Sequence, residues 1–212
     1  VSVSGGYSLD RLVTEVSERG WRDLSFAAGI PGSVGGALVG GAGAFGHLVC
    51  EYLQKAEVLH RDGNVETLPA DALGIGYRYS DAKNRKDILL EADMGYFSLG
   101  NREDLLEACR HIREEREVKH PGSYFPSAGS FFKNLPPSEA GGRRIPAGKV
   151  LEEAGVKSLR FGDAGVFEKH ANIIVNHGNA TAEDINRLAD EMARSVYEKF
   201  GILLEREVQY LC

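Results

Sequence analysis

A run of glycines between residues 29 and 46 is the first part of the chain whose composition could serve chemistry. It reads G-I-P-G-S-V-G-G-A-L-V-G-G-A-G-A-F-G, and Ser33 supplies its only polar side chain. A helix interior disfavours so many glycines, because each costs about 0.5–1 kcal/mol relative to alanine. We therefore expect a loop whose consecutive backbone N–H groups converge on an anion, for which phosphate is the usual occupant.

The alternative is a purely structural role for this run, as a tight turn between two buried elements. Known phosphate-binding signatures do not decide between the two, because no G-K-[ST] closes the run. Gly29, Gly32 and Gly35 are spaced G-x-x-G-x-x-G, which also differs from the dinucleotide signature G-x-G-x-x-G. The length of the whole run favours a phosphate or cofactor cradle.

Three other side chains are suited to reaction at an anionic substrate. Arg78 lies between two tyrosines, and its planar guanidinium suits a carboxylate. Ser130 lies between Gly129 and two phenylalanines, and Glu207 lies in a segment rich in leucine and valine. A carboxylate in such company has a raised pKa or a cationic partner. Each residue also has a structural alternative: a surface arginine, a turn hydroxyl and an edge-strand charge that deters aggregation.

Composition and charge limit the classes of function. The length of 212 residues allows one large domain or two small ones. A net charge of −6 without a basic run argues against general nucleic-acid binding. We expect no membrane span, no secretory leader and no metal cluster. The isolated Cys50, Cys109 and Cys212 predict a reducing compartment without disulfides.

Hydrophobic period and capping signals predict the elements that must position these residues. The first half should contain two strands, a hairpin and two helices: a strand at residues 1–4, a helix after Ser8, a hairpin over residues 55–68 with its turn at 61–64, a strand over Ile88–Met94, and a helix capped by Asn101 that ends before Pro121.

A proline- and glycine-rich segment after that helix, residues 121–129, predicts a domain boundary near residue 118. The second half should contain two helices and three strands: a short helix over residues 149–154, strands at 164–166 and 172–175, a helix from the capping box of Thr181 and Asp184 to Gly201, and a final strand over 202–210. The irregular alternation of helices and hairpins predicts an α+β fold.

Six motifs follow one another along the chain. They are G-I-P-G-S-V-G-G-A from Gly29, A-G-A-F-G from Ala42, Y-R-Y-S from Tyr77, P-S-A-G-S-F-F-K-N from Pro126, K-H-A-N from Lys169 and F-G-I-L-L-E-R-E-V from Phe200. Over essentially the whole chain this series resembles the UDP-N-acetylenolpyruvoylglucosamine reductase family of peptidoglycan synthesis. The first and fourth motifs are specific, whereas L-E-x-E-V alone is weak. The short spacing after Tyr77 is similar to the subgroup that lacks an extra loop and a split βαββ insertion.

The resemblance implies a cytoplasmic FAD enzyme with a fold of the vanillyl-alcohol-oxidase type. Part of the FAD-binding domain would cover residues 1–117, a smaller α+β substrate domain residues 118–201, and a C-terminal strand at 202–212 would return to the active site. NADPH would reduce the flavin, and the enolpyruvyl ether of a UDP-sugar would then take the hydride at C3. Neither a nucleic acid nor a membrane is implied as a partner, and the oligomeric state stays open.

The resemblance also implies roles for individual residues. The positions implied for FAD are Gly29, Ile30, Pro31, Gly32, Ser33, Gly35, Gly36, Ala42 and Gly43. Ser130 stands where the family's serine protonates C2, and Arg78 and Glu207 stand where its arginine and glutamate hold and polarise the carboxylate. The candidates for binding the UDP-sugar are Lys119, Asn134, Lys157 and His170.

The chain departs from the family pattern in three places. Gly41 replaces the usual Asn before A-G-A-F-G, Leu135 separates Asn134 from Pro136, and the upstream lobe with its G-x-G-S-N segment is absent from these residues. Two alternatives stay open. Another flavin oxidase of the same superfamily should lack the set Arg78, Ser130 and Glu207. A non-catalytic fragment that binds a UDP-sugar or another anion would account for the absent lobe.

Overall fold

The computed structural model describes residues 1–21, 24–95, 98–122, 125–139 and 141–210. The chain divides into two compact units, Val1–Glu115 and Arg116–Cys212. The division falls within the long helix α4 (Arg102–Lys119), which starts at the predicted cap, Asn101. The mixture of helices and antiparallel strands in both units confirms the predicted α+β class.

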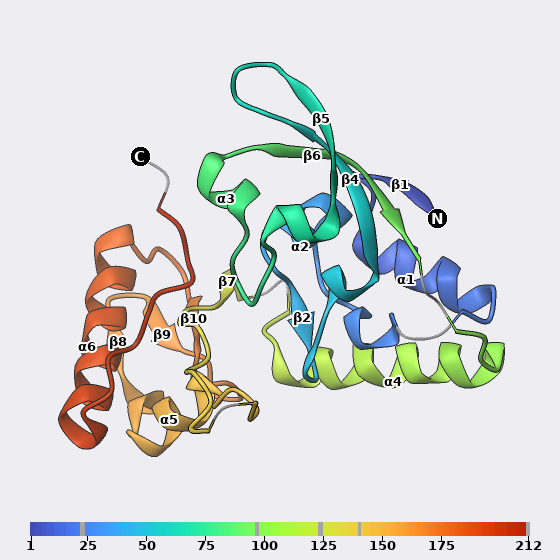
Figure 1. The fold of residues 1–212 in the computed structure, drawn as a ribbon. Coiled ribbons are helices and arrows are strands. Elements are labelled where there is room, and N and C mark those ends of the chain that lie inside the picture. Colours follow the sequence, from blue (N-terminus) through green and yellow to red (C-terminus); the bar gives the residue numbers. More distant parts are fainter. Residues whose placement is uncertain (22–23, 96–97, 123–124, 140, 211–212) are drawn as a thin grey trace. The chain divides into compact units, whose positions relative to one another are not determined.

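The first unit is built on a four-stranded antiparallel sheet of order β1-β6-β4-β5 (Figure 1). Its strands are β1 (Ser2–Ser4), β4 (Leu53–Leu59), β5 (Val65–Pro69) and β6 (Ile88–Met94). All four were predicted, and the turn between β4 and β5 lies where Gly63 has a φ of 88°. Ala56 of β4 lies opposite Ala92 of β6, and both are buried, so this face of the sheet belongs to the core.

The helices of the first unit pack against that sheet and against one another. They are α1 (Leu9–Glu18), α2 (Val34–Val39), α3 (Asp81–Arg85) and the larger part of α4. The unit also contains the 3₁₀ turns η1 (Ser25–Ala27), η2 (Val49–Tyr52) and η3 (Ala70–Leu73). A small hairpin is formed by β2 (Gly43–Ala44) and β3 (His47–Leu48). The predicted apolar face of α1 is buried. Ser17 of this helix is also buried, and its Oγ lies 3.3 Å from Cys109 Sγ of α4.

The prediction that the whole glycine run is a loop was wrong, because residues 34–39 form helix α2. Ser33 caps this helix, and its Oγ accepts a hydrogen bond from Gly36 N at 3.1 Å. Gly35 N donates to Gly5 O at 2.8 Å, and a Cβ on Gly35 would lie 2.9 Å from the same oxygen. Close packing of the helix against the turn after β1 therefore requires glycine and outweighs its poor helix propensity.

The second unit contains a smaller antiparallel sheet of order β7-β10-β9-β8. Its strands and helices are β7 (Ser127–Ser130), β8 (Arg160–Phe161), β9 (Ala164–Val166), β10 (Ile173–Asn176), α5 (Ala147–Glu153), α6 (Ala182–Phe200) and the 3₁₀ turn η4 (Val156–Ser158). Helix α6 packs on β8, β9 and α5. The capping box of Thr181 and Asp184 is confirmed, since each side chain accepts a hydrogen bond from the backbone N–H of the other residue.

The predicted final strand over residues 202–210 is wrong in extent. The segment is paired only around Arg206, which forms an isolated bridge with Phe132. Lys133 N donates to Glu205 O, and Glu207 N donates to Phe131 O, both at 2.8 Å. The Arg206 guanidinium donates to Asn186 and Asp190 of α6, at 2.9 and 2.6 Å. These side-chain hydrogen bonds attach the segment to α6, and its backbone pairing with residues 131–133 stays short.

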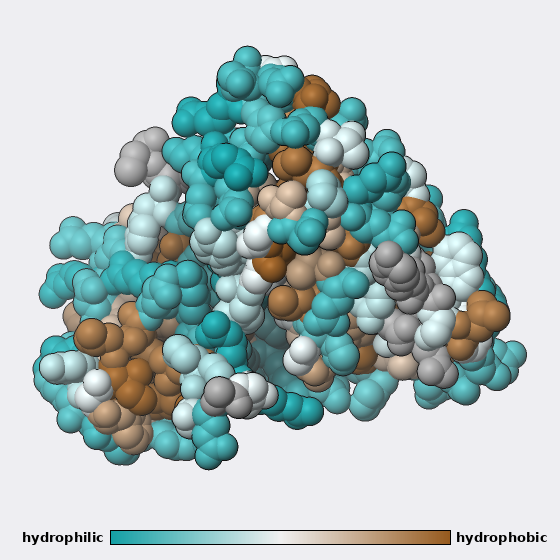
Figure 2. All heavy atoms as spheres, viewed as in Figure 1, coloured by the Kyte–Doolittle hydropathy of each residue, from teal (hydrophilic) through white to brown (hydrophobic). Residues whose placement is uncertain are grey.

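The surface seen in Figure 2 is mainly hydrophilic, with separate apolar areas. Leu203 is the most exposed of the large hydrophobic side chains in the described residues, at 81 %. No helix in the described part of the chain is long and apolar enough to cross a membrane.

Candidate functional site

The most open part of the glycine run lies just before α2. Pro31 and Gly32 are exposed, and Gly32 has a φ of 113°, a conformation that favours glycine. A Cβ on Gly32 would meet no atom within 4 Å. The main chain at residues 31–33 is therefore accessible to a group as large as a phosphate.

Many other amides of the run are already hydrogen-bonded within the unit. Their acceptors are Asp10 Oδ1 for Gly29 (2.7 Å), Tyr7 O for Val34 (2.8 Å), Gly5 O for Gly35 (2.8 Å), Ser33 Oγ for Gly36 (3.1 Å) and Ala37 O for Ala42 (2.8 Å). Gly43 serves the small hairpin, because a Cβ there would lie 2.1 Å from His47 O. The expectation that consecutive N–H groups of the whole run point to one anion was therefore wrong, and residues 31–33 are its open part.

Arg78 lies in a turn between η3 and α3. Its φ of 56° is unusual for a residue with a side chain. Gly76 and Tyr79 close the turn with reciprocal hydrogen bonds of 3.0 and 3.2 Å. The Arg78 guanidinium lies 5.2 Å from the centre of the Tyr77 ring, a cation–π distance. Tyr77, one of the two tyrosines that flank Arg78 in the sequence, therefore contacts the guanidinium and restricts its orientation.

The Arg78 turn is attached to the end of the glycine run. Arg78 N donates to Gly41 O at 3.3 Å, and a Cβ on Gly41 would lie 1.9 Å from Gly76 O. The departure at Gly41 therefore coincides with a close backbone approach that a side chain would prevent. Ser80 adds a second attachment, since its buried hydroxyl donates to Val39 O at 2.7 Å. This serine ends the Y-R-Y-S motif, but its sequence position alone indicated no role for it.

A polar hollow of about 370 Å³ lies in the second unit, within residues 130–172. Ser130, Asn134 and His170 line it, together with Lys149, Glu152 and Lys169. Three of the predicted site residues, Ser130, Asn134 and His170, therefore line the same hollow. Lys157 lies beside it, with its Nζ 2.6 Å from Glu152 Oε1. Lys119 is the exposed last residue of α4.

Ser130 is held at the end of β7, opposite Ile173 of β10. Gly129, with a φ of 74°, bends the chain before it. Behind the serine, the buried side chain of Asn172 accepts from Phe132 N at 2.9 Å and donates to Phe132 O at 2.8 Å. Asn172 O accepts from Phe131 N at 2.7 Å. Sequence reasoning missed this positioning residue, whose only signal was its place at the end of K-H-A-N.

Asn134 has a backbone role in addition to its place in the hollow. Its Oδ1 accepts from Ala147 N, the first residue of α5, at 3.1 Å. Leu135, the residue that departs from the family pattern, is buried in the core and forms a bridge with Ile145. The extra leucine is therefore accommodated by packing, with Asn134 still at the hollow.

Glu207 is half-buried, and its backbone is bonded to Phe131, the residue after Ser130. Its neighbour Glu205 is exposed and pairs with Lys133 at the surface. The two glutamates therefore have different environments. Glu207 is the one whose placement is tied to the Ser130 segment.

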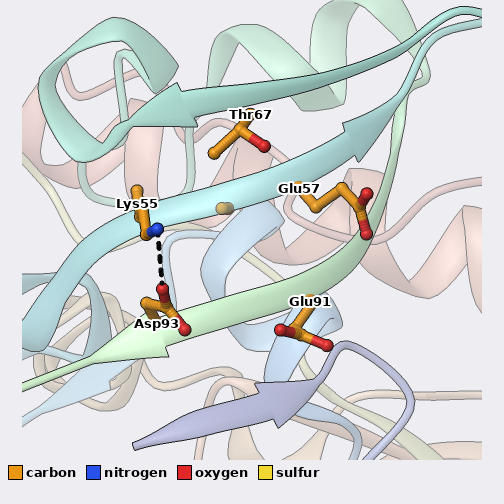
Figure 3. A pocket seen from close by; sticks show the side chains of 6 residues that line it. Lys55, Glu57, Thr67, Glu91 and Asp93 are labelled. Carbon is orange, nitrogen blue, oxygen red and sulfur yellow. Dashed lines mark ion pairs between the residues drawn. The ribbon is translucent and has the colours of Figure 1, made fainter.

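A second, smaller hollow of about 180 Å³ lies on the sheet of the first unit (Figure 3). Lys55 and Asp93 form an ion pair there at 3.2 Å, with the carboxylates of Glu57 and Glu91 nearby. None of the predicted site residues lines this hollow, and no group of side chains suited to a metal occurs among the described residues.

Comparison with known proteins relates both units to one family. The FAD binding domain family model matches residues 1–69, and the model for the UDP-N-acetylenolpyruvoylglucosamine reductase C-terminal domain matches residues 120–211. The chain is 39 % identical to a reductase of that name from Anoxybacillus flavithermus, over 99 % of this chain and 67 % of the relative. The Bacillus subtilis relative is 38 % identical, over 100 % of this chain and 67 % of its own length.

A solved structure agrees with these relatives. The crystal structure of UDP-N-acetylenolpyruvylglucosamine reductase from Thermus caldophilus matches with a TM-score of 0.80 at 32 % identity. The match covers 99 % of this chain and 71 % of that protein. The chain therefore spans about two thirds of the length of its relatives.

Proposed function

The chain belongs to the UDP-N-acetylenolpyruvoylglucosamine reductase family, and we propose that it takes part in the FAD-dependent reduction of UDP-N-acetylglucosamine enolpyruvate to UDP-N-acetylmuramate, with NADPH as hydride donor. The observation that carries the proposal is the hollow in the second unit. Ser130 and Asn134 of one motif and His170 of another line it together. We further propose that the reaction takes place in the cytoplasm, consistent with free thiols at Cys50 and Cys109.

The open main chain at residues 31–33 fits the diphosphate of FAD, because Gly32 lets a ligand approach the backbone closely. Ile30 and Ala42 are partly buried against the core on either side of α2 and would support this contact. The chemistry that FAD would supply when bound is hydride transfer, from NADPH to the flavin and from the flavin to C3 of the substrate.

Ser130 is proposed to hold the proton that C2 receives. A serine is a poor acid in water, so this role requires a fixed hydroxyl within hydrogen-bond reach of the carbon. The pairing of Ser130 with β10 and the buried Asn172 behind it supply that rigidity. Arg78 and Glu207 are proposed to hold the substrate carboxylate, where negative charge develops during the reaction.

Lys119, Asn134, Lys157 and His170 are proposed to bind the UDP-sugar. The lysines supply charge for the diphosphate, while the amide and the imidazole supply directed hydrogen bonds. The pair of Lys157 with the exposed Glu152 holds that lysine beside the hollow.

Anaerobic spectroscopy tests this function. NADPH should bleach the flavin band near ~450 nm, and UDP-N-acetylglucosamine enolpyruvate should restore it. Restoration by oxygen alone would favour the alternative flavin oxidase. A protein that binds UDP-N-acetylglucosamine but no flavin would instead be the non-catalytic binding fragment. Either result would contradict the proposal.

A further inference from the structure

We propose that His120 is a further residue of the UDP-sugar site, and that it forms an imidazole pair with His170 that takes up a proton when the diphosphate binds. This inference rests on the proposed function, since it assigns the ligand's diphosphate to the hollow that His170 lines. Nothing in the motifs of the sequence pointed to His120.

The two rings are neighbours in the second unit. Their centres are 5.9 Å apart, and their planes are inclined by 33°. His120 follows the last residue of α4, and its backbone N donates to Arg116 O at 2.8 Å. His170 is seated against α5, where a Cβ on Gly148 would lie 3.1 Å from the ring carbon Cε1. Both helix ends therefore fix the pair beside the hollow.

The hydrogen bonds of His170 decide which ring is better placed to gain a proton. Asn172 N donates to His170 Nδ1 at 3.2 Å. Nδ1 is therefore unprotonated, and the neutral ring carries its proton on Nε2, a donor for an oxygen of the substrate. Protonation of Nδ1 would break this bond. We therefore assign the added proton to His120.

The charges around the pair are mostly positive. The groups that face it are Arg116 and Lys119 of α4, Lys157 of η4 and Glu152 of α5, with Lys149 and Lys169 in the wall of the hollow. Burial lowers the pKa of both imidazoles, and the pKa of His120 is lowered further by His170 and by the cations of α4. Glu152 opposes this effect at His170. The empty site therefore holds two neutral rings among lysines.

A bound diphosphate reverses this balance. An anion within about 4–6 Å typically shifts a pKa by 1–3 units toward the charged form of a cation. The pKa of His120 then rises from below its ordinary value in the free protein to a higher value in the complex. Between those two values binding is accompanied by proton uptake, and affinity falls by up to about tenfold per pH unit as the pH rises.

Calorimetry with UDP-N-acetylglucosamine measures this uptake directly. This probe is suitable because it has no phosphate monoester, whose second pKa of about 6 would obscure the result. Titrations at one pH near 6.5 in buffers with different ionisation enthalpies give the number of protons bound. We expect between about half and one proton for the wild type, and a loss of at least half of that uptake in His120→Gln.

His111→Gln is the matched control, because His111 lies on an exposed part of the same helix and pairs with Glu115 at 3.1 Å. It should leave both affinity and proton uptake unchanged. Equal uptake in His120→Gln and wild type would overturn the inference while leaving the proposed function intact. Failure of the wild type to bind the probe at any pH would overturn both.

A second measurement avoids substitution altogether. The NMR titration of the imidazole protons in the wild type, with and without the probe, reports the pKa of each histidine. The pKa of His120 should rise when the probe binds. A constant pKa at His120 would overturn the inference even if His120→Gln failed to fold.

Discussion

Arg113 donates two hydrogen bonds, from Nε at 3.0 Å and Nη2 at 2.9 Å, to a single carboxylate oxygen of Asp10. The same oxygen accepts Gly29 N at 2.7 Å. Asp10 belongs to α1 and Arg113 to α4, so one carboxylate joins two helices to Gly29, just before the open main chain at residues 31–33. Helix α4 therefore helps to position the main chain at residues 31–33 without contributing a residue to it.

We expect Asp10→Ala to weaken FAD binding by about tenfold and to lower the free energy of unfolding by about 1 kcal/mol, because the partly exposed ion pair and the bond to Gly29 are lost together. Flavin fluorescence and urea denaturation measure the two effects. Arg11→Ala removes an exposed pair on the same helix and should leave FAD affinity unchanged. Wild-type affinity in Asp10→Ala would show that Gly29 needs no such anchor.

Arg78→Lys keeps the positive charge but loses the planar fork that suits a carboxylate. We expect kcat with the enolpyruvyl substrate to fall by about 10²–10³-fold with the fold intact. Arg85→Lys is the control, because Arg85 lies in the adjoining helix α3 and pairs with Asp87. A kcat close to that of the wild type would exclude the proposed role of Arg78.

Ser130→Ala separates the two half-reactions. Flavin reduction by NADPH needs no proton from Ser130 and should keep its normal rate. Transfer to the substrate should slow by about 10²–10⁴-fold, the usual contribution of a general acid. Stopped-flow absorbance follows the two steps separately. Slowing of both steps to the same degree would indicate a purely structural serine, and so would unchanged reoxidation.

Asp87 should make stability depend on acid pH. Burial alone would raise its pKa, but hydrogen bonds from Arg85 Nε (2.7 Å) and His60 Nδ1 (3.1 Å) outweigh this and lower the pKa below its ordinary value. A lowered pKa in the folded state means that this stabilisation is complete above the pKa of the unfolded chain and is lost as the pH falls through the folded value.

We therefore expect Asp87→Asn to be less stable than the wild type at pH 7, with the difference shrinking below about pH 4. Urea denaturation at several pH values measures it. Glu57→Gln, on the exposed sheet face of Figure 3, is the control and should show no comparable trend. A difference that stays constant down to acid pH would assign the effect of Asp87→Asn to packing.

Local signals in the sequence predicted most elements of this fold. Thr181 and Asp184 marked the start of α6 because a capping box is satisfied within one turn of the chain. The hairpin of β4 and β5 was predicted for the same reason, since its turn residues are adjacent. Helix α2 was missed because its stability depends on a contact between Gly35 and Gly5, which no local pattern encodes.

The residues of the candidate site likewise fall into those that the sequence predicted and those that depend on distant contacts. Ser130, Asn134 and His170 were named through motifs, and the fold brings them to one hollow. Asn172 and Ser80 lie in quoted motifs but were assigned no role, because their contacts are to backbone groups distant in sequence, at Phe132 and Val39. His120 carried no motif, and only its ring contact with His170 identifies it.

Asn172 uses one side chain to satisfy both backbone groups of Phe132, as a residue of a neighbouring strand would. A carboxamide presents a donor and an acceptor side by side, which no aspartate, serine or leucine can reproduce at this depth. Glutamine has the same group but adds a methylene to a closed core. In a library of all single substitutions, position 172 should rank among those that tolerate the fewest changes. Its mutational profile would then resemble that of a catalytic residue, although its hydrogen bonds to the Phe132 backbone alone account for the intolerance.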